Sequence, residues 1–225
     1  MNILIINPNT TQSMTEKVRI AAEDVAAPHV TVHVSTSQSG PASIQGPEDG
    51  VAAVPGLLRE IEAGVQQGMD GFVIACFDDT GLDECRALTN KPVIGIGEAA
   101  FHASMMLGHR FSVVTTLAVS IPVIEANLER YRVNDMCQKV RASDVPVLAL
   151  EEPGSSAEQK VSSEIGLALK QDNCGAIVLG CAGMAPLAAR LSAVHGVPVI
   201  DGVVAATGML CALIGVQHSY SPAEV

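Results

Sequence analysis

The sequence predicts an α/β fold made of two pseudo-symmetric lobes, each a mainly parallel sheet flanked by helices, with the functional site in the cleft between them. Short apolar runs alternate with segments of helical periodicity along the 225 residues. Strands that alternate with helices form parallel sheets whose two faces are both covered. A similar succession of motifs also occurs in each half of the chain, and in each half a cysteine follows an apolar run.

The apolar runs predict eight strands, because each is short and ends in or before turn-forming or polar residues. They are Ile3–Ile6, Val30–Val34, Gly71–Ala75, Val93–Ile96, Phe111–Val114, Val147–Leu150, Ala176–Leu179 and Val197–Ile200. Helical spacing of apolar residues predicts helices over 14–25, 49–67, 120–132, 156–171 and 184–194. The apolar stretch Val203–Val216 is either a buried helix or an interface, and a homo-oligomer is expected.

Composition excludes several classes of function. Hydrophobic residues make up 48% of the chain and aromatic residues only 3%, so Ala, Val, Ile, Leu and Met must form the core. The net charge is −11 and no run of Lys or Arg could hold a phosphate backbone, which argues against a nucleic-acid partner. The same acidity argues against a membrane partner, and no apolar stretch approaches the ~20 residues of a membrane span.

The N-terminus and the cysteines indicate a cytoplasmic protein. Ile3–Ile6 has no basic region before it and no cleavage site after it, which fits a first strand and not a signal peptide. The six cysteines form no CxxC pair and show no zinc or disulfide spacing, so free thiols in a reducing compartment are expected.

The two halves of the chain share a pattern. The run from Asp70 to Cys76 is followed by a helix-like stretch and then by a Pro-Val-Ile motif at Pro92, and the run from Cys174 to Cys181 is followed in the same way by Pro198. We therefore assign residues 1–97 plus 204–225 to the first lobe and 98–203 to the second. Generic α/β architecture explains part of this similarity, but it does not explain a cysteine at the same strand end of both halves.

Both of these strand-end cysteines, Cys76 and Cys181, fall where ligands bind in open parallel sheets, beyond the carboxyl ends of the strands. Asn7 ends the first strand, and Thr115 and Thr116 end the equivalent strand of the second lobe. These three residues are candidates for ligand contact, although turn and cap roles would also explain them. Asp78 and Asp79 are interpreted as turn and cap residues.

Four segments resemble a known family. Ile5–Thr11, Ile74–Asp79, Pro92–Ala99 and Leu179–Met184 together are similar to the hydantoin racemase and allantoin racemase branch of the aspartate/glutamate racemase superfamily. The resemblance covers nearly the whole chain. It implies two α/β lobes, no metal, flavin or pyridoxal phosphate, and a catalytic acid and base formed by Cys76 and Cys181.

The residues after the two cysteines differ from those of the amino-acid racemases. Each cysteine there is followed by an Asn-Thr or Thr-His pair, whereas here Phe77-Asp78 follows one and Ala182-Gly183 the other. Asp78 would repel a substrate carboxylate, so a neutral cyclic ureide suits the site better. Backbone N–H groups after each cysteine and after Asn7 are expected to hold its carbonyl groups. Loop residues near Ser43 and Ile44 are expected to contact its side chain.

Two thiols suit racemisation next to a carbonyl, because one group can remove a proton from one face while the other returns a proton to the opposite face. A thiolate is a competent base when its pKa falls from ~8.5 toward neutrality, and a helix N-terminus beyond each cysteine is expected to lower it. The remaining cysteines, Cys85, Cys137, Cys174 and Cys211, are expected to be small buried hydrophobic residues. The alternatives left open are an aspartate racemase, a maleate-isomerase-like enzyme, and a non-catalytic ligand-binding or thiol-redox protein.

Overall fold

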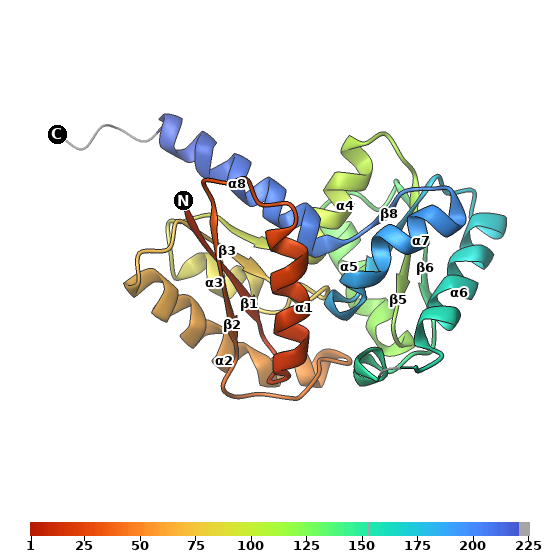
Figure 1. Cartoon of the computed structure of the whole chain (residues 1–225), viewed down its shortest axis with the longest axis horizontal. Helices are drawn as coiled ribbons and strands as arrows, with labels where there is room; N and C mark the ends of the chain where they lie inside the picture. Colours follow the sequence, from red (N-terminus) through yellow and green to blue (C-terminus); the bar gives the residue numbers. More distant parts are fainter. Residues whose placement is uncertain (153, 221–225) are drawn as a thin grey trace.

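Two four-stranded sheets form the framework of the molecule, a computed structural model that describes residues 1–152 and 154–220 (Figure 1). The first sheet contains β1 (Asn2–Asn7), β2 (Thr31–Thr36), β3 (Gly71–Ile74) and β4 (Val93–Gly95), in the order β2-β1-β3-β4. The second contains β5 (Phe111–Thr115), β6 (Cys137–Ala142), β7 (Ala176–Gly180) and β8 (Val199–Ile200), in the order β6-β5-β7-β8. All six described strand pairings are parallel, and the two sheets have the same topology, which confirms the predicted fold class.

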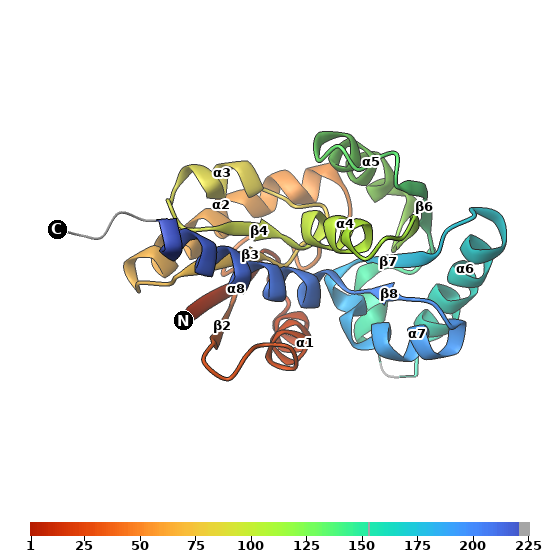
Figure 2. The ribbon, with the colours of Figure 1, turned by 90° about the horizontal axis from the view of Figure 1, so that it is seen from above.

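Helices cover both faces of each sheet (Figure 2). The α-helices are α1 (Gln12–Glu23), α2 (Pro47–Gln66), α3 (Leu82–Ala87), α4 (Ile96–Met106), α5 (Ile121–Arg130), α6 (Ala157–Gln171), α7 (Ala188–His195) and α8 (Gly202–Tyr220). The described residues also form the short 3-10 helices η1 (Ala118–Ser120), η2 (Val147–Glu151) and η3 (Ala182–Leu187). In the first lobe α2 and α3 lie on one side of the sheet and α1 on the other, and in the second α5 lies opposite α6 and α7.

The strand expected at Val147–Leu150 is wrong. That segment forms η2, and the missing strand is β6, at Cys137–Ala142. The strand β6 is an edge strand, and its sequence carries Gln, Lys and Arg in place of an apolar run. Arg141 lies on β6 and is nevertheless buried, because it pairs with Asp172 and Glu164. A polar edge strand of this kind cannot be recognised by a run of apolar residues.

One hydrophobic core extends through both lobes. A single buried cluster contains Ile5 and Val73 from the first sheet together with Val113 and Val178 from the second. The ring of Phe101 on α4 lies between the ring of Phe77, at a centroid distance of 5.4 Å, and that of Phe111, at 5.9 Å. The two lobes are thus held against each other by packed side chains, and the site between them is built on a rigid base.

The helix α8 corrects the expectation that no stretch has the length and hydropathy of a membrane span. Its most apolar 18 residues have a mean hydropathy of 1.4, and 33% of them are buried. The helix packs on α1, α4, β3 and β4, so part of its surface belongs to the core. Its outer side leaves Leu213 and Val216 exposed. An interface role for this outer side stays a prediction.

The lobe boundaries assigned from the sequence fall inside two helices. The boundary at 97/98 lies within α4, which packs on both β4 and β7, and that at 203/204 lies within α8, which packs mainly beside the first sheet. The assignment stays a prediction, and its last residues, 221–225, lie outside the described residues.

Candidate active site

A pocket between the two lobes contains both strand-end cysteines. Cys181 directly follows β7, and Cys76 follows β3 after one residue, so the parallel strands deliver the two thiols to the same region. About 490 Å³ of space not filled by atoms lies in and in front of the pocket, and this space includes open solvent. It is lined by Asn7, Asn9, Met14, Val18, Ile44, Ala75, Cys76, Phe77, Asp78, Thr116, Ser120, Val147, Gly180, Cys181, Ala182 and Gly183.

Most of the residues predicted to contact a ligand lie on the wall of this pocket. They are Asn7, Ile44, Phe77, Asp78, Thr116, Ala182 and Gly183. Thr115 does not line it, because its hydroxyl group is turned to the neighbouring strand and donates a hydrogen bond to the Gly180 carbonyl oxygen at 2.9 Å. Gly180 is required at that point, since a Cβ atom there would lie 2.8 Å from the Thr115 Cα atom.

The polar atoms of the Asn7 side chain form hydrogen bonds with residues of the turn after β1 and the start of α1. Its Nδ2 lies 2.9 Å from Asn9 Oδ1 and 3.1 Å from Thr15 Oγ1, and its Oδ1 accepts a hydrogen bond from the Asn9 N–H group. The expectation of a free backbone donor after Asn7 is wrong. Pro8 has no N–H group, and the N–H group of Asn9 already donates to Asn7 Oδ1. Asn7 therefore lines the pocket with a side chain whose polar atoms are already hydrogen-bonded within the turn.

The two thiols have matching local surroundings. The Cys76 sulfur accepts a hydrogen bond from the backbone N–H group of Asp78, and the Cys181 sulfur accepts one from that of Gly183, two residues on in each case. These contacts favour the thiolate over the thiol. Cys76 has an additional partner, since its sulfur lies 3.5 Å from Thr80 Oγ1.

The expectation of thiol pKa values near neutrality is wrong, because both thiols are desolvated. Burial raises the pKa of Cys76 to about 12, with a further increase from the charge of Asp78, and burial raises that of Cys181 to about 11. The backbone donors act in the opposite direction but are outweighed. Cys181 does stand at the N-terminus of η3, whereas α3 begins only at Leu82, too far along the chain to act on Cys76.

Asp78 is the one carboxylate that lines the pocket, and no Lys or Arg is found among the described lining residues. Burial raises the pKa of its carboxyl group to about 6, so the group is mostly ionised above neutral pH. A negative side chain without a cationic partner in the wall favours a neutral ligand over an anionic one.

Asp79 was expected to act as a cap, and the structure shows which helix it caps. Its carboxylate accepts hydrogen bonds from the N–H groups of Gly97 and Glu98 at the start of α4.

Within the described residues, no group of three or more His, Cys, Asp or Glu side chains comes together as metal ligands would.

Several lining residues were not predicted. Asn9 lies in the turn after β1, and Ser120 is the N-cap residue of α5. Both could have been named as candidates for ligand contact on the same grounds as Asn7. Val147 was assigned to a strand, and only the correct placement of η2 brings it to the pocket. Met14 and Val18 are ordinary core positions of α1, and nothing in the sequence distinguishes them.

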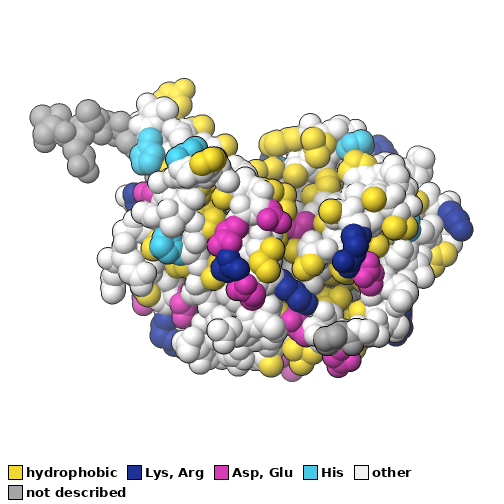
Figure 3. Space-filling model, in the orientation of Figure 1, with side chains coloured by type: hydrophobic (Ala, Val, Ile, Leu, Met, Phe, Trp, Pro, Cys, Tyr) yellow, Lys and Arg dark blue, Asp and Glu magenta, His cyan; other side chains and the backbone are white. Residues whose placement is uncertain are grey.

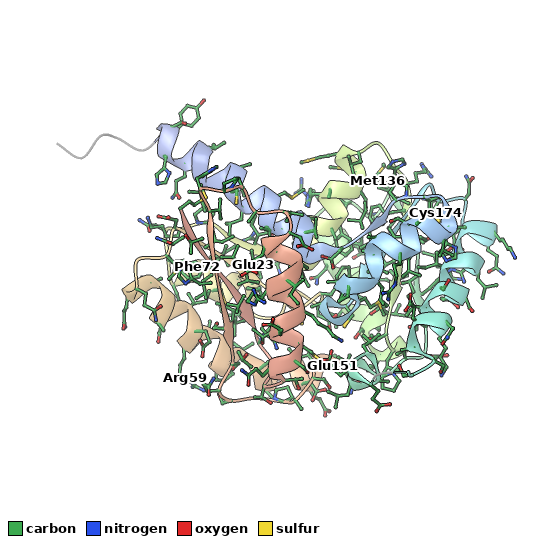
Figure 4. All side chains as sticks on the ribbon, viewed as in Figure 1. Glu23, Arg59, Phe72, Met136, Glu151 and Cys174 are labelled. Atoms are coloured by element: carbon green, nitrogen blue, oxygen red, sulfur yellow. The ribbon has the colours of Figure 1, made fainter. Side chains whose placement is uncertain are left out.

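Contacts between the lobes fix η2, whose Val147 lines the pocket. Lys17 of α1 donates to the Leu150 carbonyl oxygen at 2.8 Å and pairs with Glu151 of η2 at 2.7 Å. Figure 4 shows Glu151 at the end of α1 where the lobes meet. The Gln45 side chain accepts a hydrogen bond from the Val147 N–H group at 3.0 Å. These contacts hold η2 over the site.

The other cysteines only partly follow expectation. Cys85 is buried, as predicted, whereas Cys137, Cys174 and Cys211 are half-buried. Figure 4 shows Cys174 on the outer part of the second lobe, remote from α1. On the face drawn in Figure 3, Lys and Arg side chains stand singly among Asp and Glu and form no continuous basic patch.

The fold and the site together define a class: an α/β protein of two similar lobes in which a thiol from each lobe lines one shared pocket. The chain belongs to the Asp/Glu/Hydantoin racemase family, whose model matches residues 3–210. This confirms the resemblance seen in the four sequence segments.

Relatives of known name cover almost the whole chain. A hydantoin racemase of Rhizobium meliloti is 48% identical over 98% of this chain and 92% of its own length. The structure of an allantoin racemase from Klebsiella pneumoniae superposes with a TM-score of 0.94 at 45% identity, covering 96% of this chain and 89% of that one. An allantoin racemase from Pseudomonas fluorescens gives a TM-score of 0.92 at 36% identity, covering 96% and 92%.

Proposed function

We propose that this protein is a cofactor-independent racemase of 5-substituted hydantoins or allantoin, in which Cys76 and Cys181 exchange the roles of base and acid. The observation that carries the proposal is the presence of both thiols in one pocket, each beyond a strand of a different lobe. The names of the hydantoin and allantoin racemases similar to this chain supply the substrate class.

The reaction needs only the two thiols and the ring. One cysteine, as thiolate, removes the proton from C5, and the electron pair of the broken C–H bond moves onto the adjacent carbonyl oxygen as an enolate. The other cysteine, as thiol, gives its proton to the opposite face of C5, and the enolate electrons form the new C–H bond. The first thiolate has then become a thiol and the second thiol a thiolate. The enzyme is thereby ready for the opposite enantiomer.

Backbone donors in the cysteine turns would stabilise the enolate oxygen. The N–H groups of Phe77 and Ala182 immediately follow the two thiols, and both residues line the pocket. Fixed donors aimed at a developing oxyanion commonly supply a large part of a rate enhancement. The wall also offers the hydroxyl groups of Thr116 and Ser120 to the polar edges of a ureide ring.

The raised thiol pKa values predict the pH dependence of the reaction. The base must be a thiolate, and groups whose pKa values are raised to about 12 and about 11 are mostly protonated at neutral pH. Raising the pH therefore increases the thiolate fraction, so kcat/KM should rise about tenfold per unit between roughly pH 7.5 and 9.5. Asp78, with a pKa of about 6, is already ionised over this range.

Initial rates on a single enantiomer measure this, after subtraction of the uncatalysed racemisation at each pH. A kcat/KM that is flat or falls over that range would mean that the active base has an ordinary or lowered pKa in the free enzyme.

The proposed substrate class is tested with a panel of pure enantiomers. Polarimetry should show loss of optical rotation with 5-substituted hydantoins or allantoin, with no ring opening, and the ratio of kcat/KM values identifies the preferred 5-substituent. Deuterium exchange at Cα of aspartate or conversion of maleate to fumarate, without activity on the rings, would instead establish an aspartate racemase or a maleate-isomerase-like enzyme. Binding of the rings without exchange, or a functional Cys76–Cys181 disulfide, would establish the non-catalytic or redox alternative.

Two further properties belong to this proposal. A homo-oligomer is expected from the exposed apolar side of α8, and sedimentation would test it. A cytoplasmic location without nucleic-acid or membrane partners is expected from the acidic composition, and fractionation of cells would test it.

A further inference from the structure

The turn that carries Cys76 belongs to the first lobe but is held by a helix of the second. Two side chains of α5 reach it. The Asn127 amide donates a hydrogen bond to the Asp78 carbonyl oxygen at 2.9 Å, and the Tyr131 hydroxyl, at the end of α5, donates one to Asp79 Oδ2 at 2.8 Å. Both contacts join residues that are far apart in the sequence.

Asp79 occupies a position built to receive it. Its residue is buried, with 4% of its surface exposed, and its backbone is left-handed, at φ +49°. A Cβ atom at Gly95 would lie 2.0 Å from Asp79 Oδ1, and one at Gly97 would lie 2.9 Å from Oδ2. Two glycines therefore leave room for this carboxylate. Its Oδ1 accepts a hydrogen bond from the Gly97 N–H group at 2.9 Å. Its Oδ2 accepts one from the Glu98 N–H group at 2.7 Å and another from the Tyr131 hydroxyl group.

The same turn supplies every described polar partner of the Cys76 sulfur. The Asp79 N–H group bonds to the Cys76 carbonyl oxygen at 3.0 Å and closes the turn. Within it, the Asp78 N–H group and the Thr80 hydroxyl contact the sulfur. Any movement of the turn thus changes both the direction of the thiol and its hydrogen bonds.

Cys181 is held differently. Its turn is closed locally, by a hydrogen bond from the Met184 N–H group to the Cys181 carbonyl oxygen at 3.0 Å. The sulfur takes the Gly183 N–H group of that same turn. Neither of these contacts involves α5, so the two thiols differ in what fixes them.

We infer that Tyr131, acting through Asp79, is a positioning residue for Cys76 alone: it fixes the thiol-bearing turn from the opposite lobe, so that its loss impairs proton transfer on one face of the substrate and spares the other. The inference rests on the proposed function for its catalytic readout. Because racemisation of either enantiomer needs both thiols, the two half-reactions have to be measured separately to show which thiol is affected.

Tyr131→Phe removes the hydroxyl group and keeps the ring, whose centroid lies 6.4 Å from that of Phe101. The substitution is placed in two backgrounds, Cys181→Ser, where Cys76 is the remaining base, and Cys76→Ser, where Cys181 is. Deuterium exchange at C5 of each pure enantiomer is then followed by NMR. We expect exchange to fall about tenfold in the first background, as for a lost hydrogen bond to a charged group, and to stay within about twofold in the second.

Tyr220→Phe is the matched control, because Tyr220 is the other tyrosine of the chain and is 85% exposed at the end of α8. It should change neither exchange rate. An equal loss in both backgrounds would show a general structural role for Tyr131, and no loss in either would show that the hydroxyl group is dispensable. Both results overturn the inference.

A second measurement does not depend on turnover. Alkylation by iodoacetamide, mapped by mass spectrometry in the otherwise unaltered protein, reports the accessibility and the thiolate fraction of each thiol. Tyr131→Phe should change the labelling rate of Cys76 several-fold, since the turn that sets both its exposure and its hydrogen bonds is no longer fixed, and leave that of Cys181 unchanged. Absence of exchange in both single-cysteine backgrounds would count against the proposed function, while this labelling pattern would still decide the positioning role. Equal labelling rates in variant and parent would reject it.

Discussion

Replacing Cys76 with Ser is expected to abolish racemisation of both enantiomers while leaving deuterium exchange into one of them. The loss of racemisation should be at least about 100-fold, the usual contribution of a general acid or base. Cys181 still lines the pocket in this variant, so it can remove a proton from its own face and return a solvent deuteron to that face. The product is the same enantiomer, labelled at C5.

Cys181→Ser should show the opposite preference, with exchange confined to the other enantiomer. NMR of each pure enantiomer in deuterated buffer measures both variants, and the unaltered protein, which should label and racemise both, is the control. The prediction is that the two variants have opposite enantiomer preferences. Racemisation by either variant at near the parent rate would contradict a paired mechanism.

The second large effect is expected at the junction of the lobes, where α8 begins against the start of α4. A Cβ atom at Gly202 would lie 2.5 Å from the carbonyl oxygen of Ile96 and 3.0 Å from its Cβ atom. Because the first contact is with backbone, it cannot be relieved by turning a side chain. Gly202→Ala should lower the free energy of unfolding by about 3 kcal/mol, the upper part of the range for overpacking. The corresponding fall in Tm is roughly 6–12 °C.

Gly208→Ala is the matched control in the same helix. Gly208 is exposed, and a Cβ atom there meets nothing within 4 Å, so this change should raise stability by about 0.5–1 kcal/mol through helix propensity. Thermal and urea unfolding of the two variants measure the contrast. If Gly202→Ala were as stable as the parent, the close approach of α4 and α8 would not be a constraint on how the lobes meet.

The sequence predicted the sheets better than it predicted their edges. Seven of the eight predicted strands correspond to strands of the structure, because central strands carry apolar runs and little else. The failure at β6 has a physical cause: Lys139 and Arg141 belong to an edge strand, where one side meets solvent and a buried guanidinium is neutralised by ion pairs. Periodicity cannot report an interaction that forms only when α6 packs beside the strand.

The site, like the sheets, could be predicted only in part. The strand-end rule located Cys76, Cys181 and most of the pocket wall, because parallel strands bring their carboxyl ends to one edge. The charge state of the thiols could not be read from the chain, since desolvation depends on how the folded chain packs around them. Nor could the contact of Tyr131 with Asp79, which joins residues of different lobes through a single hydrogen bond.

The central claim, that two thiols act on the two faces of one ring carbon, is tested most directly by the unaltered protein in deuterated buffer. A pure enantiomer of a 5-substituted hydantoin is sampled at low conversion, and chiral separation with mass spectrometry gives the deuterium content of substrate and product. The two-base mechanism predicts that the product carries deuterium from its first appearance, while the remaining substrate stays protiated. A product that retains the original proton would show that one group carries it between the faces, and would contradict the account.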